Sequence, residues 1–121
     1  MLWGIRQIMT GLWNLKHSWK TVNLPDMILL RFLRMNKVFT DYGWKDYVYW
    51  QAEDKKTLKK INQLIEDICR NGNVGIGKPE PLTGTLSGFW SRRINDKDRL
   101  IYKIDEDNIY ILACRYHYGN K

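Results

Sequence analysis

The segment from Leu58 to Cys69 constrains the fold more than any other part of the chain. Its apolar side chains recur at the spacing that places them along one side of an α-helix, and most of its lysines fall off that side. Asp54 precedes the segment as an N-cap, and Gly72 follows it as a stop. The sequence therefore predicts one amphipathic helix whose stripe must be covered by another layer. The stripe residues are Leu58, Ile61, Leu64, Ile65, Ile68 and Cys69.

Three strand-like segments follow this helix and can supply the covering layer. They span residues 88–94, 99–104 and 108–115, and the short turns between them predict antiparallel hairpins. Upstream, residues 36–40 suit an edge strand, and Asp41 can cap a first helix that runs through Ala52. Strand, two helices and three strands predict an α+β fold, a two-layer sandwich with both helices on a mainly antiparallel four-stranded sheet.

Side chains of two kinds alternate along the middle strand segment. Alternate residues of a strand point to opposite faces, so one face can pack on the helices while the other presents cations. The helix-facing set is Leu100, Tyr102 and Ile104, and the opposite set is Arg99, Ile101 and Lys103.

The charge of the chain favours polyanionic partners such as RNA, DNA or an acidic protein, because the formal net charge is +7. Residues 1–34 hold five Lys and Arg against one Asp, whereas residues 35–121 hold 15 against 12 acidic residues. The main body is thus only mildly basic. Its lysine run at 55–60 is typical of a solvated helix face or, alternatively, of a contact with RNA or the ribosome.

Cysteine and histidine usage argues against a disulfide framework and against a metal centre. Cys69 and Cys114 each lie beside an apolar residue and are predicted core thiols. Only His17 and His117 are present, and no His, Cys or carboxylate cluster has ligand spacing, so we expect no metal and no cofactor. Without a signal pattern or an apolar run of about 20 residues, we expect a soluble cytoplasmic protein without membrane association.

The first 34 residues differ in character from the rest. Aromatic, apolar and basic residues before Pro25 allow a weakly amphipathic helix, which would suit an arm for a membrane surface or a partner. Alternatively this stretch is an appendage or precedes the true start, because Met27 and Met35 are both alternative starts. We divide the chain into an extension, residues 1–34, and one folded domain, residues 35–121.

A glycine-rich stretch from Gly72 to Lys78 has the spacing of a phosphate-binding P-loop. The next residue is Pro79 rather than Ser or Thr, and the stretch follows a helix instead of opening one. We therefore do not expect nucleotide binding, and we expect the glycines to turn the chain and expose Glu80. Residues 71–87 are predicted to form one long loop without regular structure.

Five ordered motifs resemble the YoeB/Txe branch of the RelE toxin superfamily, and the match is collinear across nearly all of residues 35–118. Five motifs with compatible spacings are far more specific than any one pattern. The motifs are YVYWQ at 47–51, GKPEPL at 77–82, LSGFWSRRI at 86–94, RLIY at 99–102 and CRYHY at 114–118.

This resemblance implies a RelE-like sandwich, a toxin domain over residues 35–121, and an mRNA endonuclease that acts in the ribosomal A site without a metal. It also implies a YefM-type antitoxin as partner and allows a homodimer. By resemblance, Glu80 is the general base, Arg99 stabilises the phosphate, and His117, with Tyr118 beside it, is the general acid. The residues expected to contact RNA are Arg93, Arg92 and Lys78.

The chemistry of these residue types agrees with such roles. Metal-free RNA cleavage needs a base for the 2′-hydroxyl, a cation for the phosphorane and an acid for the leaving oxygen. An unperturbed His titrates near 6.5, and Arg suits bidentate phosphate contact. A rival reading is a non-catalytic relative that binds antitoxin and operator DNA, or inhibits gyrase as ParE-type toxins do. The chain departs from the family pattern at Thr83, Lys97 and Asp98, where a basic residue, an acidic residue and a His are usual.

Overall fold

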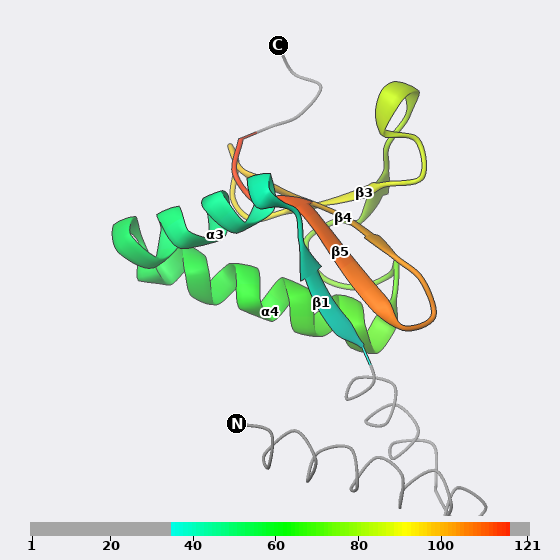
Figure 1. Cartoon of the computed structure of the whole chain (residues 1–121), viewed down its shortest axis with the longest axis horizontal. Helices are drawn as coiled ribbons and strands as arrows, with labels where there is room; N and C mark the ends of the chain where they lie inside the picture. The colour runs from blue at the N-terminus through cyan, green and yellow to red at the C-terminus, as the bar shows by residue number, and fades with distance from the viewer. Residues whose placement is uncertain (1–34, 117–121) are drawn as a thin grey trace, which may run out of the picture.

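The computed structural model describes residues 35–116, and the expectations for residues 1–34, His117 and Tyr118 fall outside that range. Two helices form one layer and a sheet forms the other, as Figure 1 shows. The elements, with the labels of Figure 1, are β1 (Asn36–Phe39), α3 (Asp41–Glu53), α4 (Lys55–Asn71), β2 (Glu80–Pro81), the 3₁₀ turn η2 (Gly84–Leu86), β3 (Trp90–Arg93), β4 (Arg99–Ile104) and β5 (Asn108–Ala113).

The sheet has the strand order β1-β5-β4-β3-β2. Neighbouring strands are antiparallel except β1 and β5, which run parallel. The predicted α+β sandwich is confirmed, with five strands in place of four. The extra strand is β2, a two-residue piece inside the stretch that was expected to be irregular. Within residues 35–116, no helix is long and apolar enough to cross a membrane.

Helix α4 forms where its periodicity predicted it. Asp54 caps its N-terminus by accepting from the N–H groups of Lys56 and Thr57, at 3.1 and 3.2 Å. Gly72 ends it with a φ of +70°, a left-handed value that favours glycine. Its apolar stripe is buried between α3 and the sheet, with Leu58 only partly buried.

Helix α3 begins with a different cap from the one predicted. Thr40, not Asp41, is the N-cap, and its hydroxyl oxygen accepts from the N–H of Gly43 at 3.0 Å. The same hydroxyl donates to the carbonyl of Leu112 on β5 at 2.9 Å. Thr40 therefore caps α3 and also ties it to the sheet, which the local sequence could not reveal.

The middle strand β4 is more buried than its alternation predicted. Leu100 and Tyr102 lie in the core, as expected. On the opposite face, however, Ile101 is 1% exposed and Arg99 9%, so only Lys103 of that set is exposed. The cause lies at the start of β4, where the N–H of Arg99 donates to the carbonyl of Tyr116 and the chain beyond β5 runs alongside.

Both cysteines are buried free thiols, which confirms that part of the prediction. Burial, together with the nearby Asp46 and Asp98 carboxylates, raises the pKa of the Cys114 thiol to about 12. Cys114 therefore stays a neutral thiol near neutral pH and is not a candidate nucleophile.

Candidate functional site

A fully buried arginine organises the loop that leads to Glu80. The Arg92 guanidinium, on β3, forms an ion pair with Asp67 on α4. It also donates to three loop carbonyls, those of Gly72 at 2.7 Å, Val74 at 3.1 Å and Ile76 at 3.0 Å. These carbonyls point inward to a cation, whereas a P-loop points its N–H groups at a phosphate. The arrangement agrees with the expectation of no nucleotide binding.

The burial of Arg92 corrects one predicted role. Its side chain is 0% exposed, and besides Asp67 and the three carbonyls it donates to the Tyr102 hydroxyl at 3.3 Å. A guanidinium held in this way is not available to RNA, so we assign Arg92 a structural role. The neighbouring Arg93 and the loop residue Lys78 are exposed, so contact with RNA stays a prediction for both.

The loop reaches β3 by a close approach that requires glycine. Gly77 has a φ of +81°, and a Cβ built there would lie 2.8 Å from the Leu64 side chain. The Gly77 carbonyl accepts from the N–H of Arg93 at 2.7 Å. This contact brings the chain against β3 just before Glu80 begins β2, so the glycine and Arg92 together place the predicted base.

We expect the Asp67–Arg92 pair to make stability depend on acid pH. Burial raises the pKa of the Asp67 carboxyl, but hydrogen bonds from Arg92, Asn71 and the Ile76 N–H outweigh this effect and hold the pKa below its usual range. A lowered folded pKa contributes stability above the unfolded pKa that is lost as the pH falls through the folded value.

Urea unfolding of wild type and Asp67→Asn, from neutral pH to about pH 3, measures this contribution. We expect the variant to have a lower free energy of unfolding than wild type at neutral pH. The difference in free energy of unfolding between the two proteins should narrow as the pH falls. A constant difference across the range would contradict the expectation. Glu66→Gln is the control, because Glu66 is the adjacent carboxylate on α4 but is exposed and is not the partner of Arg92.

Glu80 lies at the free edge of the sheet, on an exposed position of β2. It is opposite Ser91 on β3, which is opposite Ile101 on β4. Directly opposed residues share a face, so these side chains belong to the face that α4 does not cover. Two positions along, Arg93 is opposite Arg99 on the same face.

The register thus brings the predicted base and the predicted phosphate-binding cation to one face. Glu80 and Arg99 lie two strands and two residues apart, a backbone separation of roughly 12 Å from strand spacing and rise. Arg93 stands on the strand that separates them.

The guanidinium of Arg99 is oriented by its own turn. Its Nη1 donates to the carbonyl of Asn95 at 2.7 Å and to that of Asp98 at 3.1 Å. Its backbone N–H donates to the carbonyl of Tyr116 at 3.1 Å. Since Tyr116 immediately precedes His117, the chain reaches the predicted acid from a residue bonded to Arg99. The positions of His117 and Tyr118 themselves lie outside the described residues.

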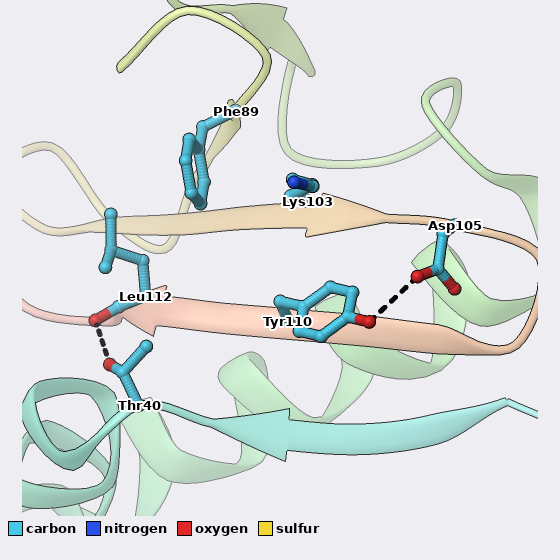
Figure 2. Close-up of a pocket in the computed structure, with 6 residues that line it drawn as sticks. All are labelled: Thr40, Phe89, Lys103, Asp105, Tyr110 and Leu112. Atoms are coloured by element: carbon cyan, nitrogen blue, oxygen red, sulfur yellow. Dashed lines mark hydrogen bonds between the residues drawn. The ribbon is translucent and has the colours of Figure 1, made fainter. Parts of the chain in front are cut away.

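A cavity that the sequence did not predict lies on the same face of the sheet. Figure 2 shows its six lining residues in front of the strands, with α4 behind them. Its volume is about 240 Å³. The ammonium of Lys103 lies 5.8 Å from the centre of the Phe89 ring and 6.0 Å from that of Tyr110. Strand alternation puts Lys103 on the side of Arg99 and Ile101. The lining residues are Thr40, Phe89, Lys103, Asp105, Tyr110 and Leu112.

In the sequence, only Lys103 pointed to this cavity, as a cation among the β4 residues that alternate with the helix-facing ones. Phe89 reaches Lys103 from the segment before β3, and Tyr110 from β5. That meeting depends on strand register, which the sequence pattern does not specify. Across residues 35–116, no group of three or more His, Cys, Asp or Glu side chains could hold a metal ion.

Comparison with known proteins gives one consistent result. A family model described as the YoeB-like toxin of bacterial type II toxin-antitoxin systems matches residues 39–118. Toxin YoeB of Streptomyces coelicolor is 55% identical over 84 residues, which are 69% of this chain and 100% of that protein. Toxin YoeB of Escherichia coli K12 is 52% identical over 84 residues, with the same coverage.

Solved structures agree in fold. A YoeB dimer from Staphylococcus aureus matches with a TM-score of 0.67 and 50% identity, over 70% of this chain and 99% of that one. The heterotetrameric YoeB-YefM complex of the same organism matches with a TM-score of 0.66, 50% identity and the same coverage. An Escherichia coli YafQ mutant matches with a TM-score of 0.60 at 19% identity, over 69% of this chain and 93% of that one, a likeness of fold alone.

Proposed function

This chain belongs to the YoeB-like toxin family of bacterial type II toxin-antitoxin systems, and from that premise we propose that it is an endoribonuclease. Its substrate is mRNA on the ribosome, and its chemistry is metal-independent. The observation that carries the proposal is the shared sheet face of Glu80 and Arg99, with the chain that leads to His117 bonded to Arg99.

Each of three groups would perform one step. Glu80 takes the proton from the ribose 2′-hydroxyl, whose oxygen then attacks the adjacent phosphorus. Arg99 stabilises the negative charge of the phosphorane, for which a planar guanidinium suits two phosphate oxygens. His117, with Tyr118 beside it, donates a proton to the leaving 5′-oxygen. The products are a 2′,3′-cyclic phosphate, or its hydrolysed form, and a 5′-hydroxyl.

Exposed cations near this centre would hold the RNA backbone. Arg93 lies between Glu80 and Arg99 in the sheet, and Lys78 lies two residues before Glu80. Both side chains are exposed. Phosphate contacts of this kind fix the register of an RNA strand and carry no sequence preference of their own.

The partners follow from relatives whose structures are known. Staphylococcus aureus YoeB was solved as a dimer and in complex with YefM. We propose that this chain likewise binds a YefM-type antitoxin and can form a homodimer, and that it acts in the cytoplasm, where ribosomes are. We also propose that residues 35–121 carry the toxin activity and residues 1–34 are an extension, because the family match starts at residue 39.

Mapping mRNA ends tests the proposal directly. Purified full-length protein is incubated with an mRNA, with and without translating ribosomes, and new 5′ and 3′ ends are located. We expect new ends within codons only when ribosomes are present, with 2′,3′-cyclic or hydrolysed phosphate termini. Expression of the protein in cells separates the alternatives. Growth arrest with intact mRNA and damaged DNA would indicate a gyrase-directed toxin and not a nuclease. Intact mRNA and DNA would indicate a module that only binds its antitoxin and operator.

A further inference from the structure

Side chains of α3 hold the first residue that follows β5. Strand β5 ends at Ala113. The next residue, Cys114, donates its N–H to the Asp46 carboxylate at 3.0 Å and accepts at its carbonyl from the Trp50 indole N–H at 2.8 Å. Asp46 and Trp50 both belong to α3, so this helix binds the chain directly after the end of β5.

A second attachment follows two residues later. Tyr116 donates its N–H to the Asp98 carboxylate at 2.8 Å, and its carbonyl accepts from the Arg99 N–H at 3.1 Å. Tyr116 has a φ of +67°, a left-handed value that is uncommon for a residue with a Cβ. Such a conformation persists only where the surroundings enforce it, and here both backbone polar groups of Tyr116 are bonded.

The residue between these two attachments is held by aromatic rings. The Arg115 guanidinium carbon lies 3.4 Å from the centre of the Tyr49 ring, on α3, and 4.5 Å from that of Tyr116. Stacking a planar cation on two rings is favourable. Residues 114–116 are therefore each attached to a fixed element, which restricts the direction in which the chain continues.

Within residues 35–116, the two carboxylates are buried and form no salt bridge. Asp46 is 7% exposed and Asp98 5%, and within residues 35–116 neither has a Lys or Arg nitrogen within 4.0 Å. Burial raises the pKa of Asp46, against the Cys114 hydrogen bond and the charge of Arg115, which lower it. Unpaired carboxylates are rarely kept inside a protein unless their hydrogen bonds are needed.

We propose that Asp98 is a positioning residue, which fixes Tyr116 beside Arg99 so that the following residue, His117, enters the cleavage site in a productive direction. Asp46 assists by holding Cys114. The proposal rests on the proposed function for its catalytic consequence.

Asn95 sets up the geometry of Asp98. Its Nδ2 donates to the second carboxylate oxygen of Asp98 at 3.1 Å, while its Oδ1 accepts from the N–H groups of Lys97 and Asp98. An amide at position 98 would therefore keep an oxygen for the Tyr116 N–H but meet Asn95 with a donor. Asp98→Asn should preserve the bond to Tyr116 and lose only the bond from Asn95.

Cleavage by full-length protein, measured over a range of ribosome concentrations so that kcat and KM are both obtained, tests the proposal. Misplacement of a catalytic group by about 1 Å can reduce a rate by about 10²-fold, so we expect Asp98→Ala to lower kcat by about that factor with KM unchanged. Asp98→Asn should recover kcat to within about tenfold of wild type. Asp54→Ala is the control, because it also removes a carboxylate that accepts two backbone N–H groups, at the start of α4. We expect its kcat to stay at the wild-type value.

Two results would overturn the proposal. One is a wild-type kcat in Asp98→Ala. The other is an equal loss of kcat in Asp98→Asn and Asp98→Ala, which would mean that the hydrogen bond to Tyr116 is not what sustains the rate. Amide hydrogen exchange separates this proposal from the proposed function. The Tyr116 N–H should be protected in wild type and exposed in Asp98→Ala, whether or not the protein cuts mRNA. If it exchanges freely in wild type, the positioning role fails even where cleavage is found.

Discussion

Replacing Glu80 with Gln is expected to slow mRNA cleavage on the ribosome by about 10²-fold or more while the protein stays folded. Glutamine has nearly the shape of glutamate but cannot accept the 2′-hydroxyl proton near neutral pH. Positioned acids and bases contribute about 10² to 10⁴ in rate, so cleavage should fall by that factor. The position is exposed at the sheet edge, and losing its charge should change stability by less than about 0.5 kcal/mol.

The measurement is the rate of appearance of new mRNA ends, together with thermal unfolding of each protein. Glu106→Gln is a matched control, because Glu106 is also exposed but lies in the turn between β4 and β5. Glu106→Gln should cut at the wild-type rate. If Glu80→Gln cuts as fast as Glu106→Gln, another group removes the proton and the role assigned to Glu80 is wrong.

Replacing Arg92 with Leu is expected to cause the largest loss of stability of any single change considered. The substitution leaves the Asp67 carboxylate and the carbonyls of Gly72, Val74 and Ile76 without their shared donor. Breaking a buried ion pair from one side costs about 3–5 kcal/mol. In a domain of this size each kcal/mol lowers the Tm by roughly 4–8 °C, so the Tm should fall by more than about 10 °C.

Arg93→Leu provides the control, since it is the same substitution one residue later on the same strand. Arg93 is exposed, and its replacement should change stability by less than about 0.5 kcal/mol. Thermal unfolding followed by circular dichroism measures both. An equal Tm for the two variants would show that the loop does not depend on Arg92. A folded Arg92→Leu protein should also cut mRNA slowly, because the loop that leads to Glu80 would lose the hydrogen bonds that hold it.

Much of the candidate site could be predicted from the sequence, but its geometry could not. The motifs marked Glu80 and Arg99, and strand alternation placed Arg99 opposite the helix-facing residues. Three-dimensional pairing then decided that β2 lies beside β3 and that Glu80 shares a face with Arg99. A two-residue strand has no periodicity of its own. Only its neighbour in the sheet defines it, so the sequence showed a loop there.

Arg92 and Arg93 also show what the sequence could predict and what only the tertiary structure decided. They are adjacent residues of one type, and the sequence proposed one role for both. In the structure one is fully buried at the centre of a loop and the other is exposed. The alternation of β3 separates them, but which side is the inside depends on where α4 and the loop pack. Burial of a charge depends on long-range contacts, which a local pattern does not contain.

The sequence by itself determined the helix α4 with its Asp54 and Gly72 ends, the bounds of β4, and the α+β class. These follow from helical and strand periodicity, caps and short turns, which act over a few residues. Only the tertiary structure decided that Thr40 caps α3, that Arg92 holds the loop and that Asp98 and Asp46 hold residues 114–116. Except for the Thr40 cap, these contacts join residues distant in the chain, so their partners become defined only when the layers pack.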